Sequence, residues 1–395
     1  MGVQIRFEPK TRAITVSEPS SVSSLQNGCY GIMQKGVISL EPEEVLYLID
    51  IRNAQCLDDA LNEYKFNALA GIFSKGAKKF FARYFTYKDW RDRGLIPRSI
   101  SELTDEKYGR NARKPYPGEK FETPKIAVHG LFSPEDLMTI IDEEEVGKEL
   151  YERYWLGQFG SYKAEQRGRI SKLDVFETLF MLKHCKLSLE NSNEKDVLKA
   201  ARKIHEYFDE MYEVFEDWRL RGFILKTGFK FGTHFRIYFP RASPKLGNSE
   251  WVHSKHVIHV FPRKSKMLIS EWARAIRVAH SVKKTFILAI PGKKLAARKK
   301  AETNFDFLLF HRKKGGIEKP SDAGAKPKYL MLSLSEEEYI GGEELAQAIE
   351  EAKDIGLEPI LAICDRETSV TYYLVKRINL PGSEYEYYEI EWEQP

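Results

Sequence analysis

Two closely matching hexapeptides constrain the fold of this chain more than any other feature. They read DWRDRG (Asp89–Gly94) and DWRLRG (Asp217–Gly222). The match continues upstream, where Ile38–Ile49 parallels Ile170–Leu182 and both segments carry apolar residues at helical spacing. Similar segments at similar spacing indicate copies of one supersecondary unit. We therefore predict a helix-rich module that occurs twice, near residues 30–98 and 165–225.

A second repeat is offset by 73 residues. Ser270–Ile290 aligns without gaps on Glu343–Ile363, and both copies end in ILAI. Each copy has the pattern of an amphipathic helix followed by a buried strand. The same offset places His256–Pro262 on Tyr329–Ser335, and both segments alternate as a strand does. The sequence thus predicts a β-α-β module that also occurs twice.

The order of these modules indicates one complete unit inside a split one. At 395 residues the chain is long enough for two to three domains. Both modules occur in the middle of the chain, whereas each flank holds one copy of one module. We predict that the two flanks form a second unit, divided by the first. The predicted boundaries are 1–98 and 327–395 for the split unit, 125–312 for the complete unit, and 99–124 and 313–326 for linkers.

The composition is that of a soluble intracellular protein. Hydrophobic residues make up 42% of the chain and charged residues 30%. No apolar run is long enough to span a bilayer, and the N-terminus has no signal-peptide pattern. The four cysteines are scattered, as in a reducing compartment. We expect a cytoplasmic protein without a membrane partner.

Charge is spread unevenly along the chain. Ser270–Lys314 holds twelve Lys/Arg against three Asp/Glu, whereas Ser335–Pro395 holds four against sixteen. The basic block suits a polyanionic partner. The acidic block suits a basic surface of the same chain or of a second copy. Both blocks could also be solvated helix faces.

Three ionisable side chains stand at the ends of predicted elements. Tyr238 ends the strand FRIYF before a proline, His253 begins the next strand, and Lys284 lies between a helix and a strand. Side chains in such places can converge on a substrate, and this set suits acid–base chemistry at an anionic centre without a metal. At the 73-residue offset, His253 becomes Lys326 and Lys284 becomes Leu357, and nothing corresponds to Tyr238. We predict that the second copy is an inactive scaffold.

Each of these residues also has a purely structural interpretation. Tyr238 could pack in the core, His253 could be a surface residue, and Lys284 could be a cation favoured at a helix C-terminus. The triplet His253, His256 and His259 could suggest zinc, but strand alternation places His256 on the side opposite the other two. No cysteine or carboxylate completes a ligand set. We expect neither a metal nor another cofactor.

Three ordered motifs run through the central unit. They are KTGFKFGTHFRIY (Lys226–Tyr238), HS followed by VIHVFP (Val257–Pro262), and SEWARAIRVAHSVKK (Ser270–Lys284). Together they resemble the catalytic domain of archaeal tRNA-splicing endonucleases. The resemblance implies an α+β fold of repeated units, each with a helix-rich α/β N-terminal subdomain and a C-terminal mixed-sheet nuclease subdomain flanked by helices. Active enzymes of this family need two catalytic and two structural units, so the chain resembles a three-unit type that acts as a homodimer.

The resemblance also implies an activity and three roles. The activity is metal-independent excision of introns from precursor tRNA at bulge–helix–bulge motifs, which leaves 2′,3′-cyclic phosphate and 5′-hydroxyl ends. By motif position, Tyr238 is the general base on the 2′-hydroxyl, His253 the general acid for the 5′-oxygen, and Lys284 the cation that stabilises the transition state. A free Tyr has a pKa of about 10, and we expect Lys284 to lower it. The alternative is a non-catalytic RNA-binding or scaffold subunit.

Further residues are implied by their positions in the resemblance. In this family two arginines of the opposite unit sandwich a bulge base by cation–π stacking. Arg277 matches one of them, and Arg312 is the candidate for the other. The family also docks an acidic loop of each structural unit on a catalytic unit, and here that loop carries Asp365 and Glu367.

One loop departs from the family pattern. Gly157–Ile170 is longer and more basic than the resemblance leads us to expect. Its Lys163 and Arg167 could contact RNA and broaden the range of substrates, or they could belong to a solvated loop.

Overall fold

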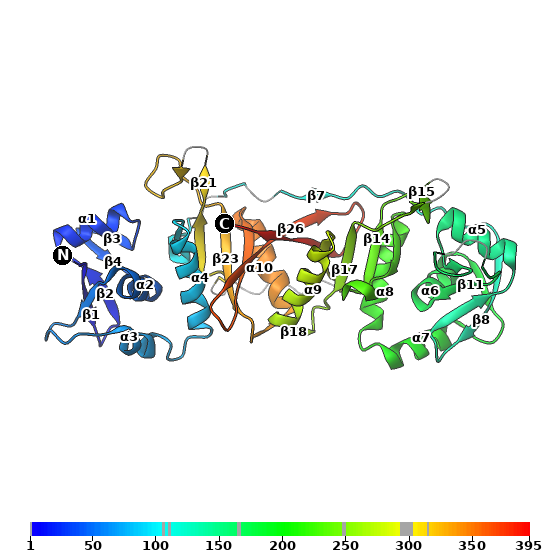
Figure 1. Cartoon of the computed structure of the whole chain (residues 1–395), viewed down its shortest axis with the longest axis horizontal. Helices are drawn as coiled ribbons and strands as arrows, with labels where there is room; N and C mark the ends of the chain where they lie inside the picture. Colours follow the sequence, from blue (N-terminus) through cyan, green and yellow to red (C-terminus); the bar gives the residue numbers. More distant parts are fainter. Residues whose placement is uncertain are drawn as a thin grey trace.

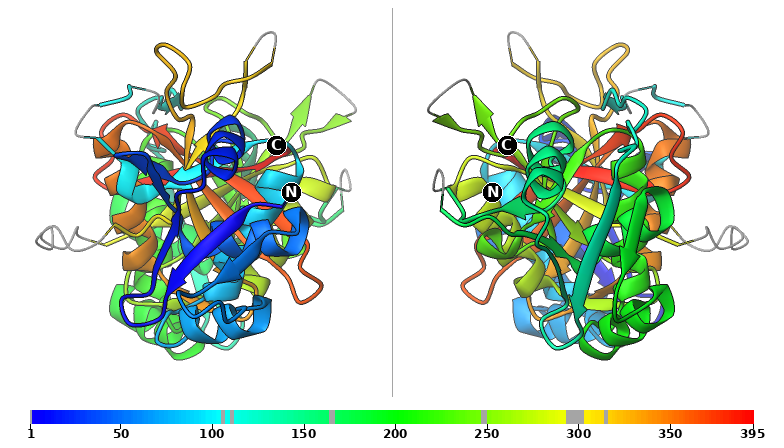
Figure 2. Two further views of the ribbon diagram at one scale, coloured as in Figure 1. Left: turned by 90° about the vertical axis from the view of Figure 1, so that its left-hand side faces the viewer. Right: turned by 90° about the vertical axis from the view of Figure 1, so that its right-hand side faces the viewer.

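The molecule is elongated, with one α/β lobe at each end and a long mixed sheet between the lobes (Figure 1). Figure 2 looks onto each lobe from its own end. The fold is of the predicted α+β class, with helices and mixed sheets. No helix in the described part of the chain is long and apolar enough to cross a membrane. The computed structural model describes residues 2–104, 107–109, 112–163, 167–246, 250–292, 303–313 and 316–395.

The N-terminal lobe is built on a sheet in the order β3-β4-β2-β1-β5, in which β1 is parallel to β5. Burial alternates along β1, so Ile5 and Phe7 enter the same core as Val45 and Leu46 of α2. The elements are β1 (Gln4–Glu8), β2 (Ala13–Val16), α1 (Pro19–Asn27), β3 (Ile32–Gln34), β4 (Val37–Ser39), α2 (Pro42–Arg52), β5 (Gln55–Leu57) and α3 (Phe66–Phe73).

The second lobe has the corresponding strand order, β10-β11-β9-β8-β12, with β8 parallel to β12. Its helix α6 begins with a capping box, in which Asp174 and Glu177 each accept a hydrogen bond from the other's backbone N–H. The elements are β8 (Ala127–Ser133), β9 (Met138–Ile141), α5 (Glu144–Tyr154), β10 (Gln158–Phe159), β11 (Ser171–Asp174), α6 (Val175–His184), β12 (Lys186–Leu189) and α7 (Glu194–Ile204).

The central sheet joins the lobes in the order β13-β14-β17-β19-β27-β26-β25-β23-β20-β6, and β7 pairs with β26. Its strands are β6 (Ile96–Ser99), β7 (Lys114–Pro115), β13 (Ile224–Thr227), β14 (Phe235–Tyr238), β17 (His256–Val260), β19 (Thr285–Ile290), β20 (Phe307–Phe310), β23 (Tyr329–Ser335), β25 (Glu358–Cys364), β26 (Val370–Asn379) and β27 (Glu386–Glu393). The helices around it are α4 (Phe80–Asp92), α8 (Phe208–Leu220), α9 (Ile269–Ser281) and α10 (Gly342–Ile355), with 3-10 turns η1 (Ile100–Glu102) and η2 (Phe229–Phe231). Small hairpins and pairs are formed by β15 (Lys245–Leu246) with β16 (Glu250–Trp251), β18 (Lys266–Leu268) with β24 (Tyr339–Gly341), and β21 (Arg312–Lys313) with β22 (Gly316–Ile317).

The two matching hexapeptides end α4 and α8 in the same way. Asp89 pairs with Arg93 at 2.7 Å, and Asp217 pairs with Arg221 at 2.6 Å, one helical turn apart in both cases. The Trp after each Asp is fully buried. The Gly that closes each hexapeptide has a φ of +77°, which a side chain disfavours. The motif therefore ends a helix and sets the turn into the next strand.

The strands that follow these turns pair in the same register at both ends of the central sheet. Ile224 of β13 lies opposite Tyr238 of β14, and Ile96 of β6 lies opposite Phe310 of β20. The two isoleucines occupy the same place after their hexapeptides. The 73-residue offset gives no counterpart of Tyr238, but the strand register does, because Phe310 holds the corresponding position.

Two predicted boundaries differ from the structure. Strand β20 falls inside the predicted complete unit 125–312, yet it pairs with β6 and β23 of the flanking segments. The last strand, β27, falls inside the predicted split unit 327–395, yet it pairs with β19 of the predicted complete unit as well as with β26. The predicted linker 99–124 contains η1 and β7, and its Tyr116 is buried. Strand partners lie far apart in sequence, so local patterns did not reveal these pairings.

Candidate active site

Three neighbouring strands of the central sheet bring Tyr238, His253 and Lys284 to one end. Strand β14 is antiparallel to β17, and β17 is parallel to β19. His256, the first residue of β17, lies beside Ile237 and Thr285. The residue that ends β14 and the residues that precede β17 and β19 therefore meet at the same edge of the sheet.

Ser254 links two of these side chains. The Lys284 Nζ donates to the Ser254 backbone carbonyl and also lies 3.2 Å from its Oγ. Ser254 is close enough to Tyr238 to favour its deprotonated form. His253 precedes Ser254 in the chain, and its imidazole is exposed. A phenol and an ammonium thus lie near one buried serine, and the residue before that serine carries an exposed imidazole.

Burial shifts the pKa of two of these side chains, Tyr238 and Lys284. It raises the pKa of Tyr238, and the charge of Arg236 and the nearby Ser254 oppose the rise. Burial, followed by the charge of Arg236, lowers the pKa of Lys284. A nearby cation does act to lower the pKa of Tyr238, but it is Arg236 rather than Lys284, and the net shift is upward.

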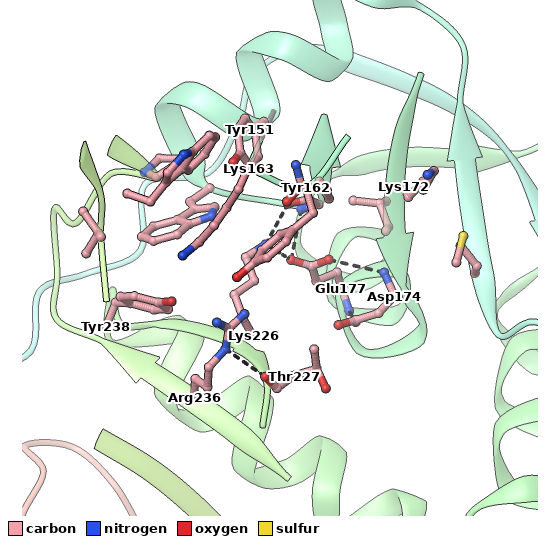
Figure 3. Close-up of a pocket in the computed structure, with 18 of the residues that line it drawn as sticks. Tyr151, Tyr162, Lys163, Lys172, Asp174, Glu177, Lys226, Thr227, Arg236 and Tyr238 are labelled. Atoms are coloured by element: carbon pink, nitrogen blue, oxygen red, sulfur yellow. Dashed lines mark hydrogen bonds and ion pairs between the residues drawn. The ribbon is translucent and has the colours of Figure 1, made fainter. Parts of the chain in front are cut away.

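A cavity of about 340 Å³ opens beside Tyr238, between the second lobe and the central sheet (Figure 3). The Tyr238 ring packs on Trp155, with ring centroids 4.4 Å apart. Tyr151, Tyr162 and Trp251 also line the cavity. Aromatic walls of this kind can stack on a planar ligand, a nucleobase for example.

A largely buried ion pair forms the polar floor of the cavity. The Lys226 Nζ lies 2.6 Å from Glu177 Oε1 and donates to the Gly157 carbonyl at 2.8 Å. The Gly157 N–H donates back to Glu177 at 3.0 Å. Burial lowers the pKa of Lys226, and burial together with the charge of Glu177 raises the pKa of Asp174. The pair fixes the start of the loop that continues to Ile170.

The two basic residues predicted in that loop lie in different settings. Lys163 lines the cavity that contains Tyr238, and its Nζ lies 5.8 Å from the centroid of the Tyr162 ring. Arg167 is exposed, and its carbonyl accepts from the Ser161 N–H at 2.8 Å, which closes the loop. The structure thus brings Lys163 toward Tyr238 and leaves Arg167 on the surface.

The two predicted RNA-clamping arginines lie on separate elements. Arg277 is exposed on α9, close enough for its charge to act on Tyr373 of β26. Arg312 is exposed on β21 and donates to the Arg93 carbonyl at 3.4 Å. No contact joins the two arginines among the described residues.

The two predicted docking acids lie in the turn between β25 and β26. One oxygen of Asp365 accepts from the backbone N–H groups of Glu367 and Ser369, both at 2.9 Å. Glu367 is exposed. Asp365 therefore shapes the turn, and the carboxylate presented to solvent is that of Glu367.

Two residues of the site, Arg236 and Ser254, were not predicted, although both lie in the motifs that carry the resemblance. Arg236 lies two residues before Tyr238 in FRIY, so strand alternation places both on one face. Its guanidinium lies 5.9 Å from the centroid of the Tyr238 ring and donates to the Thr227 carbonyl at 2.9 Å. Ser254 is the second residue of the HS pair. Alternation indicated the place of Arg236, but only the tertiary contacts show that Ser254 is shared.

Comparison with known proteins identifies a family. The family described as tRNA intron endonuclease, catalytic C-terminal domain, matches residues 208–297, which include Tyr238, His253 and Lys284. The chain is 31% identical over 170 residues to a tRNA-splicing endonuclease of Thermococcus kodakarensis, covering 43% of this chain and 83% of that protein. It is 27% identical over 168 residues to one of Pyrobaculum islandicum, covering 40% and 88%.

A third relative is matched over a smaller part of its length. The tRNA-splicing endonuclease of Methanococcoides burtonii is 33% identical over 156 residues, which cover 38% of this chain and 42% of that protein. The matched part of this chain therefore spans less than half of the Methanococcoides protein.

Proposed function

We infer that this chain, which belongs to the tRNA-splicing endonuclease family, excises introns from precursor tRNA. We further propose that cleavage occurs at bulge–helix–bulge motifs, needs no metal, and leaves 2′,3′-cyclic phosphate and 5′-hydroxyl ends. The observation that carries the proposal is the convergence of Tyr238 and Lys284 on Ser254, beside His253.

In the proposed reaction the RNA supplies its own nucleophile. Tyr238, in its deprotonated form, takes the proton of the 2′-hydroxyl, and the 2′-oxygen attacks the adjacent phosphorus. The bond from phosphorus to the 5′-oxygen breaks, and His253 gives that oxygen a proton. Lys284 stabilises the negative charge that develops on the phosphoryl oxygens. An internal nucleophile held in line needs only these three groups.

The raised pKa of Tyr238 gives Arg236 a part in the proposal. Burial leaves only a small fraction of the phenol deprotonated near neutrality, so any neighbour that favours the phenolate increases the amount of active base. The positive charge of Arg236 and the nearby Ser254 act in this direction. We assign Arg236 and Ser254 to the support of the general base.

We propose that the chain holds one catalytic and one inactive structural unit. The matching registers support this, because Phe310 replaces Tyr238 opposite the equivalent isoleucine. Met267 and Ile340, which are 73 residues apart, lie opposite each other between β18 and β24, as expected for a two-fold relation of the two halves. With Lys326 and Leu357 at the positions of His253 and Lys284, the second half lacks the reactive set.

We propose that the active form is a homodimer, with four units and two sites. We propose that the RNA clamp is built across two chains from Arg277 of α9 and Arg312 of β21. We propose that Glu367, with Asp365 shaping its turn, docks on the partner copy. Lys163 at the cavity and Arg167 on the surface are proposed to contact RNA. Light scattering should give the mass of two chains, and a monomer that cleaves RNA would contradict this arrangement.

The test of the function uses a short synthetic RNA with a bulge–helix–bulge fold. We expect cleavage in EDTA, with cyclic phosphate at the new 3′ ends and hydroxyl at the new 5′ ends. His253→Ala should abolish cleavage and keep RNA binding, because the imidazole is exposed and its loss should leave the fold intact. Cleavage that stops in EDTA, or a His253→Ala protein as active as the wild type, would overturn the mechanism. Binding without cleavage by the wild type would indicate a scaffold subunit.

A further inference from the structure

We propose that the linker between the two halves supports the active site through Tyr116, a positioning residue that holds the segments carrying Tyr238 and His253 at a fixed spacing. The inference rests on the proposed function, because positioning has meaning only for a reaction at these residues. It assigns a role to a segment whose composition indicates only a connection between units.

The linker is bound to the rest of the molecule at several of its described residues. Strand β7 extends the sheet alongside β26, with Lys114 opposite Ile378 (Figure 1). The Tyr116 N–H donates to the Asn379 carbonyl at 2.9 Å. Further on, the Glu119 N–H donates to the Arg221 carbonyl at 2.8 Å. The linker thus joins the C-terminal strands to the turn that ends α8.

The ring of Tyr116 touches both segments that lead into the site. It stacks on Phe239, with centroids 5.6 Å apart and planes at 28°. It meets the ring of His256 edge-on at 5.7 Å. Phe239 directly follows Tyr238, and His256 is three residues after His253. A single buried ring therefore spans the end of β14 and the start of β17.

The position of Tyr116 is set by a third, distant part of the chain. Its hydroxyl donates to Glu389 of β27, a carboxylate that is only 3% exposed. Lys114 donates to Glu389 and to Glu391 of the same strand. A charged and hydrogen-bonded anchor on β27 holds the linker, and the ring transmits that position to Phe239 and His256.

Tyr372, in the other half of the molecule, is a matched control that shows what a purely structural buried tyrosine does. Tyr372 is also buried, its hydroxyl donates to Asp89 at 2.6 Å, and its ring meets Trp90 at 5.3 Å. Tyr116 likewise meets Trp218, the counterpart of Trp90, at 5.7 Å. The two tyrosines share burial, a carboxylate partner and a Trp contact, but only Tyr116 contacts the segments of the proposed site.

The experiment compares Tyr116→Leu, Tyr116→Phe and Tyr372→Leu in the full chain. The single-turnover cleavage rate at saturating protein and the Kd for the bulge–helix–bulge RNA are measured, with the urea midpoint as a record of stability. We expect Tyr116→Leu to slow cleavage by about 10- to 100-fold, the range for small misplacements of reacting groups, with Kd unchanged. Tyr116→Phe keeps the ring, and Lys114 still anchors the linker on Glu389 and Glu391, so the rate should be kept. Tyr372→Leu should lose stability and keep the rate.

Several results would overturn the inference. One is a Tyr116→Leu rate equal to that of Tyr372→Leu, and another is a Tyr116→Phe rate as low as that of Tyr116→Leu. If Tyr116→Leu does not fold, Phe239→Leu removes the other face of the stack at a residue that is 38% exposed, and it should show the same rate loss. A wild-type protein that cleaves no RNA would instead overturn the proposed function, and the inference with it.

Discussion

The Nζ of Lys284 lies 3.2 Å from the Oγ of Ser254, one residue along the chain from His253. This contact joins the residue before β19 to the loop before β17. It ties the ammonium to the residue that follows the exposed His253.

Replacing Lys284 with Ala should lower the single-turnover cleavage rate by about 100-fold or more, because a preorganised charge near the phosphoryl oxygens is lost. RNA binding should change little, since many other cations contribute to it. Lys283→Ala is the matched control, as Lys283 is the exposed neighbour. Equal rates for the two variants would exclude the proposed role of Lys284.

Replacing Arg236 with Gln should raise the pKa of Tyr238 further, because the charge that opposes the effect of burial is removed. At a given pH less phenolate is then present, so cleavage slows and its dependence on the phenolate moves to higher pH. A single-turnover pH–rate profile measures this. Lys230→Gln serves as control, since Lys230 is an exposed cation that faces the Tyr162 ring at 5.3 Å. Superimposable profiles for Arg236→Gln and wild type would contradict the prediction.

Replacing His259 with Phe should make the protein less sensitive to acid. Burial lowers the pKa of His259 to about 4, whereas an unfolded His titrates near about 6.5. Between these values the unfolded chain binds the extra proton, so His259 costs the wild type about 1.4 kcal/mol of stability per pH unit as the pH falls. The His259→Phe variant has no imidazole at this position and does not lose stability in this way. Its stability relative to the wild type should therefore rise from pH 6.5 to pH 4.

The comparison must be made between variant and wild type, because other groups also contribute to the pH dependence of stability. Burial raises the pKa of Glu43 to about 7, and this carboxyl favours the folded state as the pH falls. His234, whose ring centroid lies 4.7 Å from that of His259, has its pKa lowered to about 3 by burial. Urea unfolding at several pH values gives the difference, and a difference that does not change with pH would refute the assignment.

Replacing Lys226 with Met should destabilise the protein by about 3 kcal/mol or more, because the charge of Glu177 is left buried without its partner. The double variant Lys226→Met/Glu177→Gln should recover part of this loss, since the amide oxygen can still accept from Gly157. Urea unfolding measures both.

The control for this pair is an exposed one. Arg202 and Asp209 lie 2.9 Å apart with more than half of each side chain exposed. Arg202→Met should change stability by less than about 1 kcal/mol. A Lys226→Met cost no larger than that of Arg202→Met would show that the buried pair is not an anchor.

The fold class was predictable, and particular residues show why. The DWRDRG and DWRLRG motifs encode a local structure: an ion pair one turn apart, a buried Trp and a Gly at positive φ. The places of Tyr238 and Lys284 at strand ends also follow from local alternation. Their catalytic roles, with that of His253, stay predictions until the variants are measured.

Other features could not be read from local patterns. Strand β20 lies within the predicted complete unit but pairs with β6 and β23, because strand partners are chosen across the chain. Phe310 as the counterpart of Tyr238 is visible only in the strand register, because β6 and β20 lie far apart in the sequence whereas β13 and β14 are neighbours. The upward pKa shift of Tyr238 depends on burial against Trp155, which belongs to another lobe.

The sequence by itself determined the repeated segments and the α+β class and indicated three candidate side chains, since helical and strand periods are written into neighbouring residues. Tertiary structure alone decided which strands meet, which cation opposes the burial of Tyr238, and that Tyr116 from a polar linker enters the core beside the site. These outcomes depend on desolvation and on contacts between segments far apart in the chain. Such contacts become favourable only once the surrounding elements have packed.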